Sequence, residues 1–375
     1  MTSPTSRNRL SVVMLNWRDT THPEGGGSER YVETVAAGLA AEGHDVTLFC
    51  AAYDGAPARE VRDGVRIVRA GGKLTVYGRA LYHLLSRRLG RPDVVVDVQN
   101  GLPFWSRLAT RAPVVVLVHH VHREQWRVIY GHTMAAIGWW LESRLAPRLY
   151  RRCQYVAVSE ITRRELAALG VDRARCTVVH NGTAPPPATT SPREQTPRIC
   201  VLGRLVPHKR VEHVLAAAAR LRDRWPELRV AVVGDGWWRD ELHRYVDRLG
   251  LADMVEFCGH VDEQRKHEEL SRAWLLAAPS IKEGWGLVVV EAATHLLPTV
   301  GYRHAGGLAE SVVDGESGIL VDSFDEFVEA IGSLLEDYEL RHRLGKAAAE
   351  HAAKFRWPAT VAAWDHLVRT TAGSR

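Results

Sequence analysis

Short apolar runs rich in β-branched residues alternate along this chain with segments of helical periodicity. Such runs are typical of buried parallel strands, and their alternation with helices is typical of sheets built from crossover units. The predicted strands of the first half are Leu10–Trp17, Val46–Ala51, Val94–Val98, Val114–Val118 and Tyr155–Val158. Those of the second half are Ile199–Leu202, Val230–Val233, Trp274–Ala278 and Gly318–Val321. The pattern predicts an α/β protein with two Rossmann-like sheets.

A proline-rich segment divides the chain near its middle. Residues 184–197 carry five prolines and no apolar periodicity, which is typical of a stiff linker. The 375 residues also exceed the size at which one core usually stops growing. We expect an amino-terminal domain at 1–183, the linker at 184–197 and a second domain at 198–356. The helical stretch 357–375 is expected to pack back toward the amino-terminal domain.

The composition is that of an ordinary globular protein, with 46% hydrophobic and 25% charged residues. The sequence has no run of eighteen apolar residues, and its polar start lacks the apolar core of a signal peptide. Its five cysteines are scattered singly. These features predict a cytoplasmic protein with reduced, structural cysteines. All but six of the 49 basic residues are Arg, which suits anion binding or reflects a GC-rich genome, and no nucleic acid is implied.

A glycine-rich turn, Gly25-Gly26-Gly27, follows the first predicted strand and precedes a helix expected from Tyr31 to Glu42. Such a turn lets a phosphate approach bare N–H groups at the positive end of a helix dipole. The dinucleotide fingerprint needs a third glycine where Arg30 stands. The second candidate, Gly234-Asp235-Gly236, has Arg239 at that position. An NAD-dependent oxidoreductase is therefore disfavoured.

Two cations follow the first strand of the second half. Gly203-Arg204 and Lys209 lie between that strand and a helix expected over Val211–Arg224. Ligands of open α/β sheets bind at the carboxyl ends of strands, so Arg204 and Lys209 are candidates to neutralise a diphosphate. The alternative is a solvated turn.

A second motif, Lys282 to Ala293, has glycines that open an almost wholly apolar helix. Glu291 lies within the apolar run, where a buried carboxylate requires hydrogen-bond donors. The hydroxyls of a ribose would supply them, or an internal ion pair would. Glu283, just before the helix, is available to a sugar.

The predicted strand Val114–Val118 ends in His119-His120. A histidine pair at the ligand end of a strand indicates either a catalytic imidazole or ordinary packing. Alternation of side chains from the strand favours His119 as the functional one.

Together these motifs resemble family 4 of the glycosyltransferases over nearly the whole chain. The matching positions are Gly26-Gly27, Leu117-Val118-His119, Val158-Ser159, Gly203-Arg204-Leu205 with Lys209, Glu283-Gly284-Trp285-Gly286-Leu287, the E-x7-E pair Glu283 and Glu291, and Trp357. The resemblance implies the glycosyltransferase-B fold, in which two Rossmann-like domains face each other across a cleft. The second domain would hold a nucleotide sugar and the first an acceptor.

The resemblance also implies roles for individual residues. His119, Arg204, Lys209 and Glu283 would form the catalytic set: the two cations hold the diphosphate, Glu283 the sugar hydroxyls and His119 the sugar near its 6-position. Glu291 would bind the ribose. The implied donor-binding positions are Gly26, Gly27, Gly203, the backbone around Val261, Gly284, Trp285, Gly286, Leu287 and Glu291. Retention of anomeric configuration is a property of the family.

Three positions depart from the family pattern, and they put the base and the sugar in doubt. They are Arg210 and Leu297 in place of glycine and Trp237 in place of proline. The sequence also has no D-x-D motif, so no metal and no other cofactor are expected.

Between Arg123 and Arg152 aromatic and arginine residues are crowded together. They include Trp126, Tyr130, Trp139, Trp140 and Tyr150, with Arg127, Arg144, Arg148 and Arg151. Helical spacing places the last three arginines in one stripe. The segment fits peripheral contact with an anionic inner membrane face and a lipid-linked acceptor, or core tryptophans beside a solvated charged face. A hydrophobic natural-product acceptor would account for the same aromatics.

We therefore predict a metal-independent, retaining hexosyltransferase that uses a nucleoside-diphosphate sugar. The acceptor would be a hydroxyl of a lipid-linked or cell-envelope glycan or of a hydrophobic natural product. The alternatives are a nucleotide-sugar epimerase of the same fold, a sugar phosphorylase, which would require a lysine for pyridoxal phosphate, and a non-catalytic nucleotide-sugar-binding protein.

Overall fold

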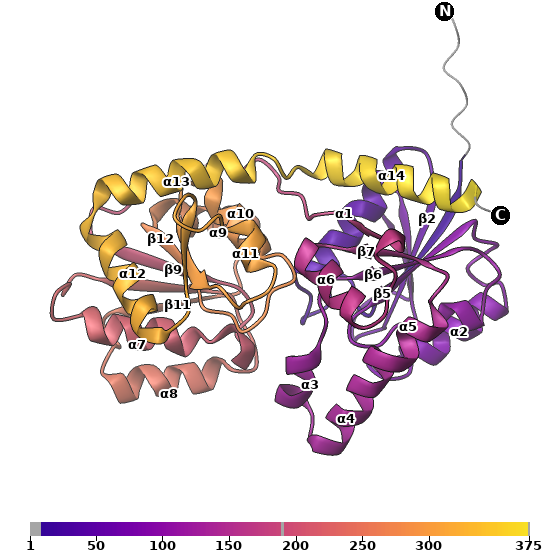
Figure 1. Cartoon of the computed structure of the whole chain (residues 1–375), viewed down its shortest axis with the longest axis horizontal. Coiled ribbons are helices and arrows are strands. Elements are labelled where there is room, and N and C mark those ends of the chain that lie inside the picture. Colours follow the sequence, from indigo (N-terminus) through magenta and orange to yellow (C-terminus); the bar gives the residue numbers. More distant parts are fainter. Residues whose placement is uncertain (1–8, 189–190, 374–375) are drawn as a thin grey trace, which may run out of the picture. The chain divides into compact units, whose positions relative to one another are not determined.

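The computed structural model describes residues 9–188 and 191–373, and the chain divides into two compact units (Figure 1). Unit 1 comprises residues 1–182 and 357–375, and unit 2 comprises residues 183–356. Residues 1–8, 189–190 and 374–375 lie outside the described residues. They include the polar start, two positions of the proline-rich segment and the end of the expected closing helix.

Unit 1 is built on a sheet whose described strands follow the order β3-β4-β2-β1-β5-β6-β7-β8. Their bounds are β1 (Ser11–Leu15), β2 (Asp45–Cys50), β3 (Arg59–Arg62), β4 (Val65–Arg69), β5 (Val94–Gln99), β6 (Val114–Val118), β7 (Gln154–Ala157) and β8 (Cys176–Val178). The edge strand β3 pairs antiparallel with β4, and the other pairs are parallel. The strand order reverses between β1 and β5, which makes this the topological switch point where ligands of such sheets bind.

Helices cover both faces of the sheet in unit 1 (Figure 1). They are α1 (Gly27–Ala41), α2 (Val76–Leu85), η1 (Ser106–Leu108), α3 (Arg123–Ile129), α4 (His132–Trp140), the π-turn η2 (Leu141–Leu145), α5 (Ala146–Leu149), α6 (Glu160–Ala168), η3 (Arg173–Arg175) and α14 (Trp357–Gly373). The closing helix α14 packs on α1, where Gly38 leaves room for Val361. The indole of Trp364 donates a 2.7 Å hydrogen bond to the hydroxyl of Tyr31. The carboxyl-terminal helix thus completes unit 1.

Unit 2 carries a parallel sheet with the order β11-β10-β9-β12-β13-β14 among the described strands. The bounds are β9 (Arg198–Leu202), β10 (Arg229–Val233), β11 (Val255–Gly259), β12 (Leu275–Ala278), β13 (Thr299–Tyr302) and β14 (Gly318–Val321). Numbered within the unit this is 3-2-1-4-5-6, the doubly wound order of dinucleotide-binding sheets. Its switch point lies between β9 and β12. The α/β class with two Rossmann-like sheets is therefore confirmed.

The helices of unit 2 are η4 (Pro207–Lys209), α7 (Val211–Leu221), α8 (Arg239–Leu249), α9 (Glu263–Arg272), α10 (Leu287–Ala293), α11 (Leu308–Ser311), α12 (Phe324–Glu336) and α13 (Tyr338–Ala352). The core between helices and sheet is apolar and buried. No helix in the described parts of either unit has the length and apolar character needed to cross a bilayer.

The proline-rich segment was expected to be a linker, but its second part is fixed to unit 2. The carbonyl of Glu194 accepts a 2.8 Å hydrogen bond from the indole of Trp274, and its carboxylate binds Arg272 at 2.5 Å. The hydroxyl of Ser271 donates to the carbonyl of Ser191. These polar contacts hold the segment against the start of the sheet, so the boundary between the units falls at residue 182 instead of at a linker.

The glycines of Gly234-Asp235-Gly236 allow two loops to pass closely. A Cβ on Gly234 would overlap the carbonyl oxygen of Gly203, and Gly234 also has φ +133°. We expect Gly234→Ala to lower the free energy of unfolding by about 2–4 kcal/mol, as chemical denaturation would measure. Gly332→Ala, where the added Cβ makes only an ordinary 3.5 Å contact in α12, should have little effect. Equal stability of the two variants would contradict this packing role.

Candidate functional site

A pocket lies at the switch point of the unit 2 sheet. It is formed by the carboxyl ends of β9 and β12, which pair with each other, and by the loops that follow them. The lining residues are Val201, Leu202, Gly203, Arg204, Lys209, Val211, Ala277, Ala278, Pro279, Ser280, Glu283 and Val288. The structure thus brings four of the predicted site residues, Gly203, Arg204, Lys209 and Glu283, to one pocket where the fold is expected to bind a ligand.

The loop after β9 places both cations of this pocket. Gly203 has φ +144°, a conformation open to glycine, and it turns the chain out of the strand toward exposed Arg204. The short helix η4 then carries Lys209 back to the pocket wall. The amide of Ile281 donates a 2.8 Å hydrogen bond to the carbonyl of His208, which ties this loop to the one that carries Glu283.

Lys209 and Glu283 form an ion pair in the pocket, with 2.5 Å between Nζ and Oε1. The hydroxyl of Ser280 donates to the same carboxylate oxygen at 2.7 Å. Burial alone would raise the pKa of Glu283, but the charge and hydrogen bond of Lys209 and the hydrogen bond of Ser280 outweigh it and hold that pKa below its usual value. Glu283 is therefore an anion at neutral pH, ready to accept hydrogen bonds from hydroxyl groups.

The backbone of Glu283 is clamped by a loop that sequence reasoning missed. Its amide donates to the carbonyl of Ala305 at 2.8 Å, and its carbonyl accepts from the amide of Gly307 at 2.9 Å. A Cβ on Gly306 would lie 2.8 Å from that carbonyl oxygen, so the clamp requires glycine. In the sequence, the Gly306-Gly307 pair is the feature that could have indicated this clamp. It follows β13, a strand that the apolar pattern did not predict.

Trp285 was expected to contact the donor, but its side chain is buried inside unit 2. It packs edge-on against Phe355 with ring centroids 4.7 Å apart. The indole therefore anchors the motif within unit 2, and as a buried side chain it does not line the pocket. Gly286, with φ +91°, begins helix α10 at Leu287, and Gly284 lies against the backbone of Gly307.

Glu291 forms an ion pair with Lys266 of helix α9, with 2.8 Å between Oε1 and Nζ. Lys266 also binds Glu263 at 2.9 Å. Of the two sources of donors expected for Glu291, the structure shows the internal ion pair. Val261 lies in the turn between β11 and α9, half-buried against the core.

His119 directly follows β6 in unit 1 and is 95% buried, against the ring of Tyr31 at 5.4 Å. Burial, with the nearby His122, lowers the pKa of His119 to about 3, so its imidazole is neutral at physiological pH. Its Nε2 has no hydrogen-bond partner among the described residues. Buried polar atoms normally have a hydrogen-bond partner, so a buried nitrogen that lacks one favours a ligand contact over simple packing. The ring of the neighbouring His120 instead packs against that of His122, with the ring centroids 4.0 Å apart.

Helix α1 begins at Gly27, earlier than the expected Tyr31, so Gly26 and Gly27 form its amino terminus, but a carboxylate of the chain already lies there. Glu29 accepts a 2.9 Å hydrogen bond from the amide of Gly26 and lies 3.6 Å from Arg18. A phosphate at this turn would share its donors with Glu29. Arg18, which the sequence motifs did not single out, supplies positive charge beside the turn.

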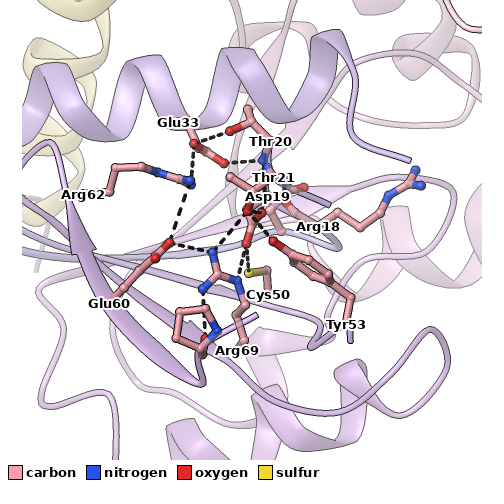
Figure 2. Close-up of polar contacts among 12 residues, drawn as sticks. Arg18, Asp19, Thr20, Thr21, Glu33, Cys50, Tyr53, Glu60, Arg62 and Arg69 are labelled. Atoms are coloured by element: carbon pink, nitrogen blue, oxygen red, sulfur yellow. Dashed lines mark hydrogen bonds and ion pairs between the residues drawn. The ribbon is translucent and has the colours of Figure 1, made fainter. Parts of the chain in front are cut away.

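A buried network fixes the loop that carries this glycine turn (Figure 2). Figure 2 shows the guanidinium of Arg69 between Asp19 and Glu60, at 2.5 and 2.7 Å. Asp19 also accepts from the amide and hydroxyl of Thr21 and, at 3.4 Å, from the thiol of Cys50. Burial raises the pKa of Cys50, so this residue is a structural thiol. The network holds residues 19–21 at the carboxyl ends of β2 and β4.

Within the described residues, one group of side chains has the residue types and the spacing that a metal ion requires: Glu256, Cys258 and Glu269. Arg198 binds both carboxylates, at 2.8 and 2.6 Å, and Arg265 and Arg272 also bind Glu269. These guanidinium groups neutralise the carboxylates, whose negative charge would otherwise be available to bind a metal ion. The group is therefore a structural ion network outside the pocket.

Comparison with known proteins agrees with this geometry. The chain matches the model "Glycosyltransferase Family 4" over residues 25–186 and "Glycosyl transferases group 1" over residues 187–351. Sucrose-phosphate synthase from Thermosynechococcus elongatus superposes with a TM-score of 0.83 over 98% of this chain and 100% of that one, at 20% identity. HepE of Anabaena, solved with UDP-glucose, superposes with a TM-score of 0.75 over 98% and 100%, at 19% identity. The fold and site define a glycosyltransferase of the glycosyltransferase-B class.

Two curated relatives are similar to this chain in sequence. D-inositol 3-phosphate glycosyltransferase 2 of Catenulispora acidiphila is 42% identical over 173 residues, which are 43% of this chain and 40% of that relative. Glycogen synthase of Mycobacterium tuberculosis is 27% identical over 94% of this chain and 93% of its own length. The two family models together extend from residue 25 to residue 351. The chain belongs to glycosyltransferase family 4.

Proposed function

We propose that this chain transfers a hexosyl residue from a nucleoside-diphosphate sugar to an acceptor hydroxyl, with retention of configuration and without a divalent metal. The observation that carries the proposal is the unit 2 pocket, where Arg204, Lys209 and the anionic Glu283 meet at the switch point. The solved complex of HepE with UDP-glucose supports a nucleotide sugar as donor. Proteins named as inositol phosphate glycosyltransferase and glycogen synthase support a hydroxylated acceptor.

Each candidate residue has a separate task in this proposal. Arg204 and Lys209 bind the diphosphate and stabilise the negative charge that develops as it leaves. Glu283 holds hydroxyls of the donor sugar and stabilises the positive charge developing on its ring. His119, neutral with an unbonded Nε2, exchanges a hydrogen bond with a sugar hydroxyl.

The reaction proceeds on one face of the sugar. The bond between the anomeric carbon and the diphosphate oxygen breaks while the bond to the acceptor oxygen forms on the same side. The leaving phosphate oxygen takes the proton of the acceptor hydroxyl, so no protein base is required. The pocket lining contains a single carboxylate, Glu283, and that carboxylate is engaged by Lys209, so cationic side chains replace a metal clamp.

The proposal is tested by product analysis with a panel of nucleoside-diphosphate hexoses, sugar acceptors and lipid-linked acceptors, in the presence of a chelator. We expect transfer to continue without divalent metal, and NMR coupling constants should show an α-linked product from an α-linked donor. Loss of turnover in chelator that Mg²⁺ restores would overturn the metal-free mechanism. A β-linked product would overturn retention, and an epimerised nucleotide sugar without transfer would indicate the epimerase alternative.

Glu291 is proposed to bind the ribose, which belongs to both the donor and the nucleotide product. Glu291→Gln should therefore weaken binding of free nucleoside diphosphate about ten- to a hundredfold in calorimetry, because a charge-assisted hydrogen bond is lost. Lys266, which holds Glu291 at 2.8 Å, positions this carboxylate. Lys266→Met should weaken the same binding to a lesser extent, whereas Glu316→Gln, at an exposed position of unit 2, should leave it unchanged. Unaltered binding in Glu291→Gln would exclude the ribose contact.

A further inference from the structure

Positive charge is concentrated in one part of unit 1. Residues 73–152 contain thirteen basic and four acidic residues, whereas the whole chain contains 49 and 44. Two of the four acidic side chains, Asp97 and Glu142, are buried, and Asp93 binds the amide of Ser11 at 2.9 Å. The exposed charge contributed by these elements is therefore predominantly that of arginine.

Large apolar side chains are exposed on the same elements. In the hairpin formed by α3 and α4, Met134, Ile137 and Trp140 are 59%, 48% and 54% exposed. On α2 and η1, Leu85 and Leu108 are 67% and 66% exposed. Monomeric proteins leave single apolar residues on the surface, but clusters beside basic residues mark interaction sites.

These elements adjoin one another within unit 1. Helix α2 packs on η1, and η1 is linked to α5 through Asp97, which accepts 2.6 Å hydrogen bonds from both Ser106 and Tyr150. Helix α5 continues α4 through the π-turn η2. The hairpin of α3 and α4 extends away from the sheet (Figure 1). Exposed arginines follow the same elements: Arg87, Arg88, Arg107, Arg144, Arg148 and Arg151.

The structure separates structural aromatics from surface ones in this region. Trp126 is half-buried and donates a 2.6 Å hydrogen bond to Glu142, and Tyr150 is wholly buried. Core packing therefore accounts for these two residues. It does not account for Trp140, which lies on α4 just before the exposed arginines of η2 and α5.

We propose that the surface formed by α2, η1 and the α4–α5 region, called here the basic apolar surface, docks on a bilayer with anionic headgroups. Arginine attracts such headgroups, and exposed Trp, Leu and Ile side chains insert at the boundary of headgroups and acyl chains. A nucleic acid would use the arginines but would leave the aliphatic side chains without partners. The inference rests on the proposed transferase function and names its acceptor as a lipid-linked hydroxyl at the membrane surface.

The geometry of unit 1 connects this surface to the predicted acceptor side. The hairpin begins at Arg123, three residues after His120, and Glu142 binds both the amide of His122 and the indole of Trp126. A bilayer on the hairpin would therefore lie on an element joined directly to the carboxyl end of β6, where His119 has its unbonded Nε2. A lipid-linked acceptor would reach that edge without leaving the membrane.

The test is flotation of the full-length protein with vesicles of phosphatidylcholine alone or mixed equally with phosphatidylglycerol. We expect binding to the mixed vesicles at low salt and its loss at high salt. Arg144→Gln/Arg148→Gln/Arg151→Gln should lower the partition coefficient about a hundredfold, because each arginine near an anionic surface contributes about a factor of five. Trp140→Ser should lower it about tenfold.

Two controls match these variants. Arg220→Gln/Arg222→Gln/Arg224→Gln removes the same charge from exposed positions of unit 2, and Val61→Ser removes an exposed apolar side chain from β3. Both should bind vesicles like the wild type. Absence of wild-type binding, or equal losses in the controls, would overturn the proposal. Nucleoside diphosphate binding, measured without vesicles, should be unchanged in every variant, so failure of membrane docking is distinguished from failure of the donor site.

Discussion

Glu283→Gln is expected to lower turnover about a hundred- to a thousandfold, because it removes the charge that stabilises the developing positive charge on the sugar ring. The same change should not weaken binding of free nucleoside diphosphate. Glu283 is paired with Lys209 at 2.5 Å, so a diphosphate must compete with this carboxylate for the ammonium group. Glutamine removes that competition, and diphosphate affinity should stay equal or rise.

Initial-rate kinetics and calorimetry with free diphosphate would measure both effects, with Glu316→Gln as an exposed control in unit 2. The opposite pattern is equally clear. If Glu283→Gln abolishes diphosphate binding while Glu291→Gln leaves it intact, the roles proposed for the two glutamates are wrong.

Lys209→Met is expected to weaken nucleoside diphosphate binding about ten- to a hundredfold, because one of two cations at the diphosphate is lost. The same substitution should also alter how the free energy of unfolding depends on pH. In the wild type the lowered pKa of Glu283 contributes stability above the pKa of an unfolded glutamate, and this stability is lost as pH falls. Without Lys209, burial is the dominant effect on Glu283, and its pKa rises above that of an unfolded glutamate. The ionised carboxylate then destabilises the folded state instead of stabilising it. The variant should then be destabilised most at neutral pH and recover as pH falls through that raised pKa.

Denaturation at pH 7 and pH 5 would measure the reversal, with Lys346→Met as an exposed control. Lys209→Met/Glu283→Gln should regain stability at pH 7, since the unpaired carboxylate is gone, but it should not regain diphosphate binding. The difference in free energy of unfolding between Lys209→Met and the wild type could instead be the same at pH 7 and at pH 5. In that case the ion pair does not set the protonation of Glu283.

The apolar runs predicted most strands whose two faces are buried, but they missed β13, although all four of its residues are buried. Val114–Val118 and Gly318–Val321 have the predicted bounds, and the other predicted strands differ at their ends by one or two residues. The missed strands are β3, β4, β8, β11 and β13. Several of them, such as β3 with Arg59 and Arg62, carry polar residues at a sheet edge and lack a continuous apolar run.

The sequence by itself determined the α/β class, the glycosyltransferase family and four residues of the unit 2 pocket, because strand periodicity and motif spacing are local properties of the chain. It did not decide the partners of those residues. The pairing of Glu291 with Lys266, the burial of Trp285 and the clamp at Gly306-Gly307 join positions 20 to 70 residues apart, through contacts that exist only in the folded core. The tertiary structure also decided which aromatics of the 123–152 segment are core and which are surface. Helical spacing places side chains on faces, but only packing shows which face is covered.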